Sequence, residues 1–253
     1  MRRTLACFAA VLAAGCGSGG SPTDAASTGA DLAMAGPDMA VGPDMAKPAS
    51  MCTAAVEQLL EPVDMVSSGV VNTLSDTGGV KTLYVDATAG GIMPAKPHPR
   101  LYVNLGTATR VQVSDVGART STGWDLALKR VVLFTNDGDG GPGMGGSLSV
   151  NKPFEQVTAA DAMGQSFTTE SFVDADCNPM MDPIGEVLTS MSNWYDYDQQ
   201  TNLVTPAPNT TWIIRGGTGK LYKLAIDSYY SLPDGTMGME PASGHYKLRV
   251  AAL

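Results

Sequence analysis

The sequence predicts an all-β domain, built mainly from antiparallel sheets with few short helices. Short apolar or alternating runs lie at Val80–Asp86, 100–105 and 109–114, separated by glycine, proline, asparagine and aspartate. This spacing is typical of antiparallel sheet proteins. Helical periodicity is scarce. The one useful helix candidate near the start of this region lies at 54–60 and must end before Pro62.

The C-terminal third shows the strand pattern most clearly. Residues 211–215 lead into a glycine turn at 216–219 and then into an alternating run at 220–230. The apolar face of that run consists of Tyr222, Leu224 and Ile226. The last segment repeats the pattern, with an apolar face of Tyr246, Leu248 and Val250. Each segment therefore predicts a strand with one buried side, and His245 is expected on the solvated side of the last one.

The first fifteen residues have the pattern of an export signal. Arg2 and Arg3 precede an apolar stretch at 5–14, which is too short to span a hydrocarbon core of about 30 Å as a helix. The stretch runs into Leu-Ala-Ala-Gly-Cys at 12–16, which resembles a bacterial lipobox with its large aliphatic residue one place early. We expect residues 1–15 to be a lipoprotein signal peptide and Cys16 to carry the lipid; the alternative is an ordinary signal peptide with a chance cysteine.

Residues 16–50 have the composition of a disordered tether. They are rich in glycine, proline, alanine and aspartate, and the sequence Gly-Pro-Asp-Met-Ala occurs at 36–40 and again at 42–46. Such a segment has no amphipathic face and buries too little surface to offset the entropy of ordering it. The remaining residues, 51–253, are expected to form the β domain.

Composition and motifs exclude several functions. The chain has 16 Lys and Arg against 25 Asp and Glu, with a formal net charge of −9, so it lacks the basic face that nucleic acid requires. It has two histidines, and the Gly-Gln-Ser-Phe segment at 164–167 lacks the second glycine of a nucleophile elbow. We therefore predict that the protein is not an enzyme. Acidic segments at 137–139 and 174–178 lack the glycine and the closing glutamate of a calcium loop, and we expect solvated loops there.

Four motifs follow one another in a specific order. They are Thr-Gly-Trp-Asp-Leu-Ala-Leu-Lys-Arg at 122–130, Thr-Asn-Asp-Gly at 135–138 with a glycine-rich continuation to 146, Trp-Tyr-Asp-Tyr-Asp at 194–198, and the two strands with their glycine turn at 212–230. Together they resemble the HmuY-like haem-binding lipoprotein family, over about residues 80–253. The resemblance implies a mostly antiparallel HmuY-like β domain whose loops hold haem.

The resemblance also implies a location and partners. It implies a lipid-anchored protein at the outer membrane or cell surface of a Gram-negative cell, which scavenges or carries haem. The partners would be haem or a haem-carrying protein and an outer-membrane receptor. Membrane contact would occur only through the lipid, and no nucleic-acid partner is expected.

The haem ligands are expected in loops, and the sequence departs from the family there. Asn202 stands where related sequences carry histidine, and amide is a poor iron ligand. The other ligand region, 172–191, has no histidine but contains Met180 and Met181, whose thioethers can ligate iron. Met144, in the glycine-rich loop, is the third candidate. For each methionine the alternative is that it fills a gap in a core or a loop.

The cysteine count predicts one disulfide. With Cys7 removed and Cys16 lipidated, Cys52 and Cys177 remain as an even pair in an oxidising compartment. A bridge between them would close a loop of more than a hundred residues, and in the chain-entropy model it would contribute about 4–5 kcal/mol.

Two functions from different classes remain open. The first is a haem-binding surface lipoprotein. The second is a non-catalytic surface interaction module of the same fold that has lost haem ligation and binds a protein, a glycan or calcium. The shared motifs favour the first function, and Asn202 favours the second.

The lipidation site can be tested directly. Cys16→Ser should release the mature protein from the membrane into the soluble fraction, because the lipid would be its anchor. Cell fractionation and the mass of the mature protein measure this. A variant that stays membrane-bound with unchanged mass would contradict the assignment of Cys16.

Overall fold

The structure of the protein is a computed structural model that describes residues 52–90, 97–237 and 243–253, all within the unit Lys47–Leu253. The expected signal peptide at 1–15, with Cys16, and the expected tether at 16–50 lie outside the described residues. Among the described residues, no helix has the length and apolar character needed to cross a membrane.

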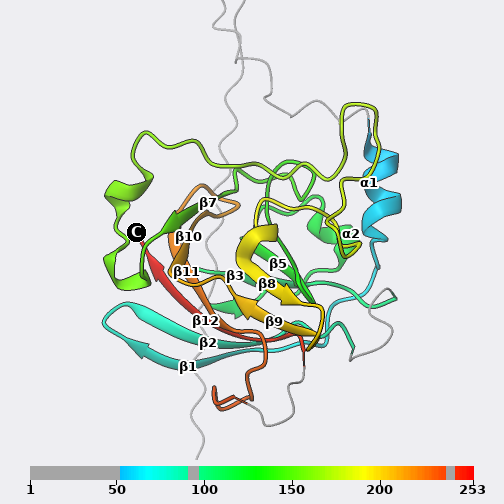
Figure 1. The fold of residues 1–253 in the computed structure, drawn as a ribbon. Coiled ribbons are helices and arrows are strands. Elements are labelled where there is room, and N and C mark those ends of the chain that lie inside the picture. The colour runs from blue at the N-terminus through cyan, green and yellow to red at the C-terminus, as the bar shows by residue number, and fades with distance from the viewer. Residues whose placement is uncertain (1–51, 91–96, 238–242) are drawn as a thin grey trace, which may run out of the picture. The chain divides into compact units, whose positions relative to one another are not determined.

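Two antiparallel sheets form the body of the unit (Figure 1). In spatial order, the six-stranded sheet contains β1 (Val71–Thr77), β2 (Val80–Asp86), β12 (His245–Ala252), β11 (Leu221–Ser228), β10 (Thr210–Arg215) and β7 (Gly146–Asn151). The four-stranded sheet contains β4 (Thr109–Arg110), β3 (Leu101–Asn104), β5 (Leu126–Lys129) and β6 (Val132–Thr135). A separate hairpin pairs β8 (Tyr195–Asp198) with β9 (Leu203–Pro206).

Helices are few and short among the described residues. They are α1 (Thr53–Leu60), α2 (Asp115–Ala118) and the 3-10 helices η1 (Phe154–Gln156), η2 (Ala159–Ala162) and η3 (Ser192–Trp194). Figure 1 shows α1 and α2 on the side of β5, at the right of the view, whereas η1 and η2 lie at the opposite side. The fold is therefore all-β, as the sequence predicts.

The four-stranded sheet is the middle layer. Because side chains alternate between the two faces of a strand, Leu126 and Leu128 of β5 face the six-stranded sheet and Ala127 faces away from it. The core between the sheets takes alternate residues from both, including Leu83, Val103, Ile214, Leu224 and Leu248. The opposite face of the four-stranded sheet is covered by α1, α2 and the segment around Phe172. Residues 172–188 are thus placed over one face of a rigid sheet.

The Trp194 motif is part of the core between the sheets. The Trp194 side chain is almost fully buried, its ring lies 5.4 Å from the ring of Tyr246 and 5.7 Å from that of Tyr229, and its Nε1–H donates to the carbonyl oxygen of Val131 at 2.9 Å. Tyr195, the next residue, begins β8. This packing fixes the start of the β8–β9 hairpin against the sheets.

Two buried polar side chains join the sheets at the other motifs. The carboxylate of Asp125, just before β5, accepts hydrogen bonds from the N–H of Leu105 at 2.7 Å and from the N–H of Gly217, in the β10–β11 turn, at 3.0 Å. The Asn136 side chain donates to the Trp124 carbonyl oxygen at 2.8 Å and accepts from the N–H of Gly143 at 3.0 Å. These bonds tie the glycine-rich loop and the β10–β11 turn to the four-stranded sheet.

Most strand predictions agree with the structure. The strand at Val80–Asp86, the hairpin at 211–230 and the buried faces of β11 and β12 are confirmed, and the helix expected at 54–60 is α1. The strand expected at 109–114 is too long: β4 ends at Arg110, and Ser114 instead caps α2 by accepting a hydrogen bond from the N–H of Gly117 at 3.1 Å.

Two expectations of solvated side chains are wrong. Asp137 is buried and accepts a hydrogen bond from Thr135 Oγ1 at 2.8 Å, and Asp139 accepts from the N–H of Phe172 at 2.9 Å. Asp137 thus stabilises its own loop, and Asp139 ties that loop to the segment that begins at Phe172. His245 lies on the predicted face of β12, but it is half-buried because its ring stacks on Tyr84 and its Nδ1 lies 2.6 Å from the Tyr84 hydroxyl.

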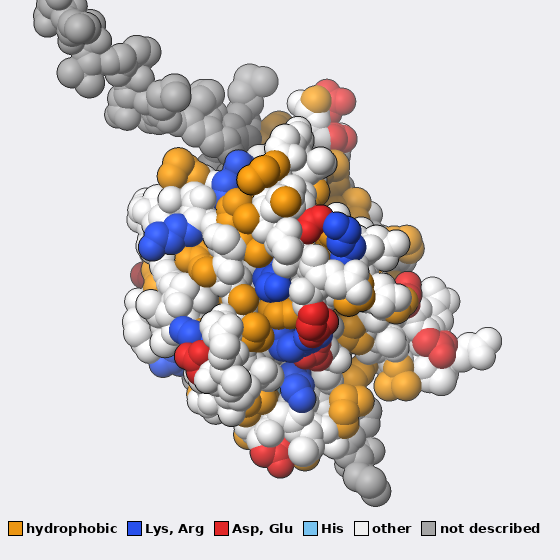
Figure 2. Space-filling model, turned by 90° about the vertical axis from the view of Figure 1, so that its left-hand side faces the viewer, with side chains coloured by type: hydrophobic (Ala, Val, Ile, Leu, Met, Phe, Trp, Pro, Cys, Tyr) orange, Lys and Arg blue, Asp and Glu red, His pale blue; other side chains and the backbone are white. Residues whose placement is uncertain are grey.

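The side of the domain at the left of Figure 1 is a mixed surface. Figure 2 shows basic and acidic side chains next to one another there, between apolar patches. In the six-stranded sheet, Arg249 of β12 pairs with Asp227 of β11 at 2.9 Å and with Glu155 of η1, and its guanidinium lies 4.8 Å from the ring centre of Phe154. Opposite charges thus pair with one another on this sheet.

Removal of the Asp125 carboxylate tests the connection between the sheets. Asp125→Ala leaves the buried N–H groups of Leu105 and Gly217 without that acceptor, so the free energy of unfolding should fall by roughly 2–4 kcal/mol. Chemical denaturation measures this. Asp227→Ala, which removes an exposed ion pair, is the control and should cost less than about 1 kcal/mol. Equal losses in the two variants would contradict the role given to Asp125.

Candidate functional site

The three candidate methionines lie in two places. Met180 and Met181 belong to the segment 172–188, over the four-stranded sheet. Met144 lies in the glycine-rich loop before β7, where its N–H donates to the Gly217 carbonyl oxygen at 2.9 Å and its side chain is 63% exposed. Met181 is 44% exposed and lines a pocket, whereas neither Met180 nor Met144 is among the residues that line it. The structure therefore separates Met144 from the other two candidates.

The pocket has a volume of about 650 Å³ and lies between α1, the segment 172–188 and the edge of the four-stranded sheet. From α1, Ala55 and Leu59 contribute apolar surface. The opposite wall carries Cys177, Met181 and Val187. Lys129, Arg130 and Val132, at the β5–β6 turn, and Arg100, before β3, also line it, and so do two acidic residues, Glu61 and Glu186. The result is a partly apolar cavity whose lining includes three basic and two acidic side chains.

The segment 172–188 is a narrow double turn. The N–H of Met180 donates to the Phe172 carbonyl oxygen at 2.9 Å, and the N–H of Leu188 donates to the Met180 carbonyl oxygen at 2.8 Å. An aspartate closes each turn: Asp174 Oδ1 accepts from the N–H of Asn178 at 2.8 Å, and Asp182 Oδ1 accepts from the N–H of Glu186 at 2.8 Å. These bonds explain why the sequence has an aspartate at the start of each turn.

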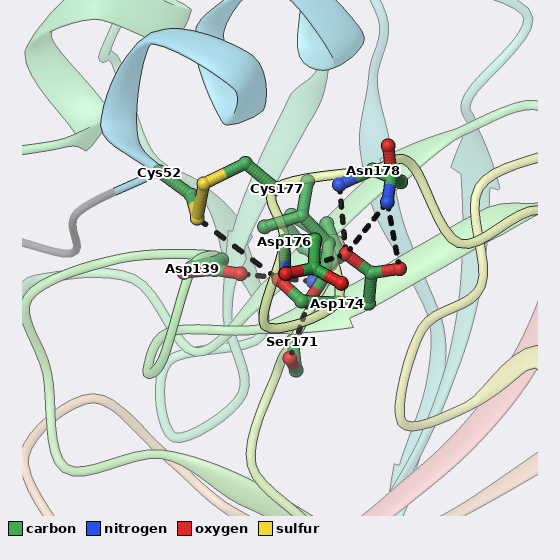
Figure 3. Close-up of a disulfide and its surroundings, with 9 residues drawn as sticks. Cys52, Asp139, Ser171, Asp174, Asp176, Cys177 and Asn178 are labelled. Atoms are coloured by element: carbon green, nitrogen blue, oxygen red, sulfur yellow. Dashed lines mark hydrogen bonds between the residues drawn. A yellow bond between two sulfur atoms is a disulfide. The ribbon is translucent and has the colours of Figure 1, made fainter.

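A disulfide joins the two walls of the pocket (Figure 3). It links Cys52, which precedes α1, to Cys177, which lies in the first of the two turns, with a Cα–Cα distance of 5.2 Å. These are the two cysteines that the sequence analysis pairs. Figure 3 shows Asp174 beside this link, with dashed lines from its carboxylate to Asn178. Hydrogen bonds from the Asn178 backbone and side chain lower the pKa of Asp174, so the first turn is closed by an ionised carboxylate.

The basic residues of the pocket are held in place by the fold. Arg100 is 6% exposed, pairs with Asp115 at 3.3 Å and donates through Nη2 to the Leu60 carbonyl oxygen at 2.9 Å. Its buried Nε has no acceptor among the residues that the structure describes. Lys129 Nζ donates to the His98 carbonyl oxygen at 2.7 Å. The charges therefore stand at defined positions on one side of the pocket.

Glu170 anchors the base of the double turn. It is buried, and its carboxylate accepts hydrogen bonds from the N–H of Thr135 at 2.9 Å, the N–H of Ser190 at 2.8 Å and the Ser190 hydroxyl at 2.6 Å. Burial raises the pKa of Glu170 to about 7, outweighing these hydrogen bonds, which lower it; the charge of Asp137 adds to the rise. The base of the double turn thus contains a carboxyl group that titrates near neutral pH.

Two other residues that bear on haem ligation, Asn202 and the histidine His98, lie outside the pocket lining. Asn202 lies in the β8–β9 turn, where its Oδ1 accepts from the Tyr197 hydroxyl at 2.8 Å. His98 is half-buried and its carbonyl oxygen binds Lys129. Within 52–90, 97–237 and 243–253, no group of three or more histidine, cysteine, aspartate or glutamate side chains is placed to hold a metal ion.

The three basic residues of the pocket could not be recognised as a group from the sequence. Lys129 and Arg130 close the Trp124 motif, and Arg100 follows His98-Pro99, but nothing local in the sequence signals that they meet. The only available signal was that this motif ends in two basic residues although 153–214 contains no lysine, arginine or histidine.

Fold and site together define a β-sandwich domain with a partly apolar pocket that is lined by Met181 and by both basic and acidic side chains. A family model described as "HmuY protein" matches residues 98–240, more than half of the chain. The chain belongs to the HmuY family.

Three crystal structures have similar folds. A protein described as an HmuY-like heme binding protein from Bacteroides vulgatus is 16% identical, with a TM-score of 0.46, covering 74% of this chain and 97% of that one. A protein described as a lipoprotein from Bacteroides fragilis is 18% identical, with a TM-score of 0.44 and coverages of 71% and 92%. The apo HmuY analog of Tannerella forsythia is 10% identical, with a TM-score of 0.43 and coverages of 74% and 97%. No curated protein matches the sequence.

The raised pKa of Glu170 predicts a pH dependence of stability. The ordinary pKa is 4.5 and the folded-state pKa is about 7, so the folded protein binds the proton more tightly than the unfolded chain. Stability should therefore fall as pH rises from 4.5 to 7 and be constant above that range. Relative to Glu170→Gln, the free energy of unfolding of the wild type should drop by about 3 kcal/mol across this interval.

Denaturation at several pH values measures this difference. Glu155→Gln is the control, because hydrogen bonds from its own backbone N–H and from Arg249 lower the pKa of the exposed Glu155, and its effect should be flat from pH 4.5 to 7. A flat difference for Glu170→Gln as well would contradict the predicted titration of Glu170.

Proposed function

We propose that this protein binds haem in the pocket between α1 and the double turn at 172–188, with Met181 as an iron ligand. The observation that carries the proposal is the presence of the Met181 thioether and three basic side chains on the same pocket. Membership of the HmuY family supports it.

The chemistry of the pocket fits the group. A volume of about 650 Å³ lies within the range of cofactor sites, roughly 300–1,000 Å³. Ala55, Leu59 and Val187 offer apolar contact to a flat macrocycle, and Lys129 and Arg130 offer positive charge to its two carboxylates. The charge of Arg100 is paired with Asp115, but its buried Nε, which has no acceptor among the described residues, remains as a hydrogen-bond donor on that side. Haem would supply an iron that a thioether can ligate.

The proposal includes the cellular location that the sequence predicts. In this proposal residues 1–15 direct export, Cys16 carries the lipid, and residues 16–50 hold the β domain, 51–253, away from the membrane surface. The protein then acts without catalysis as a carrier or scavenger of haem at the cell surface, and its partners are a haem-carrying protein or an outer-membrane receptor.

The alternative is a surface interaction module that binds a protein without haem. Exposed apolar side chains on the double turn favour it: Met181, Ile184 and Leu188 are all exposed. In that case Met181 would contact a partner protein.

A haem titration distinguishes these functions. Purified protein should change the Soret band of haem, and Met181→Ala should weaken binding of ferrous haem tenfold or more, because a thioether favours ferrous iron. The double replacement of Met180 and Met181 by alanine should match the single variant. Met144→Ala tests the outlying candidate and should have little effect.

The control is Met163→Ala, since Met163 is 73% exposed and does not line the pocket. Circular dichroism should be unchanged in every variant. A wild-type spectrum typical of two imidazole ligands would reject Met181 as a ligand, and the absence of any Soret change in both redox states would favour the interaction module.

A further inference from the structure

We propose that the Cys52–Cys177 disulfide is a redox-sensitive latch that holds the two walls of the pocket together. When it is reduced, α1 separates from the double turn and the pocket loses its ligand. The effect on haem rests on the proposed function, but the movement of the walls does not.

The latch joins the two walls where they meet. Cys177 itself lines the pocket, and Cys52 stands directly before α1, whose residues Ala55 and Leu59 form the other wall. The floor comes from the four-stranded sheet, through Val132 and its neighbours. Neither wall belongs to a sheet, so their separation is not fixed by a strand ladder.

The two ends of α1 are held by different interactions. At its C-terminal end, the Leu60 carbonyl oxygen accepts from Arg100, which is fixed by its buried pair with Asp115. At its N-terminal end, the cap residue Cys52 makes no side-chain capping hydrogen bond. There Cys52 and Val56 pack in the apolar cluster over the four-stranded sheet, and the covalent link runs to Cys177. A helix of eight residues is marginal in water without tertiary support. Loss of the covalent link should therefore loosen the first turn of α1 first.

The opposite wall has a similar asymmetry. The base of the double turn is anchored by Glu170, whereas its first turn closes on itself through Asp174 and reaches α1 through Cys177. Reduction should therefore free the tip of the turn and leave the base in place. The sheets, which share a separate core, should not change.

The redox step is ordinary thiol–disulfide exchange with a dithiol. A thiolate of the dithiol attacks one cysteine sulfur, forms a mixed disulfide with it and displaces the other cysteine as a thiolate. The second thiol of the reagent then attacks the reagent's own bound sulfur and releases the first cysteine. Two electrons and two protons pass to Cys52 and Cys177, which become thiols, and the reagent becomes a cyclic disulfide. Cys177 is half-buried, at the pocket wall, so the reagent can approach from the pocket.

Hydrogen exchange of the full-length protein tests the latch without any haem. Amides of 53–60 and 174–187 should exchange at least tenfold faster after reduction with dithiothreitol, and also in Cys52→Ser/Cys177→Ser without reductant. Amides of β11 and β12 should be unchanged. Glu57→Gln, which removes the ion pair between α1 and Arg119 at the end of α2, is the control and should keep the slow exchange of the oxidised wild type.

Haemin titration of the same samples gives the second readout, with an expected loss of affinity of tenfold or more in the reduced and double-serine forms. Unchanged exchange in both walls would overturn the latch. Loss of the whole β-sheet circular dichroism signal on reduction would also overturn it, because the disulfide would then support the fold and not the pocket. Faster exchange without haemin binding in either form would keep the latch and reject the proposed function.

Discussion

The structure depends on a pair of buried polar side chains that join its two sheets. Asp125 binds the N–H groups of Leu105 and Gly217, one in each sheet's connecting loops, and Asn136 holds the glycine-rich loop beside them. A buried carboxylate surrounded by donors is costly to disturb. Position 217 has no room for a side chain, because a Cβ on Gly217 would lie 2.5 Å from the Trp124 carbonyl oxygen. The motifs that identify the family are therefore the parts that align one sheet on the other.

Strand alternation and cysteine pairing were predictable from the sequence. The first follows from the order of neighbouring residues, and the second follows from the number of cysteines that remain. The apolar faces of β11 and β12 could be read from every second residue, and two cysteines were left to pair. The end of β4 could not be predicted, because the segment that contains Ser114 could continue the strand or cap a helix. It caps α2 because the Ser114 hydroxyl accepts a hydrogen bond from the N–H of Gly117. The burial of Asp137 was missed for a related reason: its partner Thr135 is local, but the Glu170 beside them comes from a distant segment.

The candidate site was predictable only in part. Met181 was among the candidates because the expected ligand region, 172–191, has no histidine and a thioether can ligate iron. The pocket itself, however, is formed only when α1, the β5–β6 turn and the double turn come together. Arg100 reaches it only because Asp115 and Leu60 hold its guanidinium. The members of such a cluster come from separate segments, so no fixed spacing in the sequence reveals them. The thioether could therefore be predicted from the sequence, whereas the basic residues of the pocket are recognised only in the structure.

The position of Met180 and Met181 on the double turn affects how the pocket would respond to a change in the length of that turn. Met180 and Met181 are adjacent on an extended stretch, so they point to opposite sides, and only Met181 lines the pocket. An insertion of one residue in the turn that Asp174 closes would move every following residue by one position and turn its side chain to the other face. Met180 would then take the place of Met181. Two successive methionines therefore keep a thioether on this wall after such an insertion, a change that surface turns commonly tolerate.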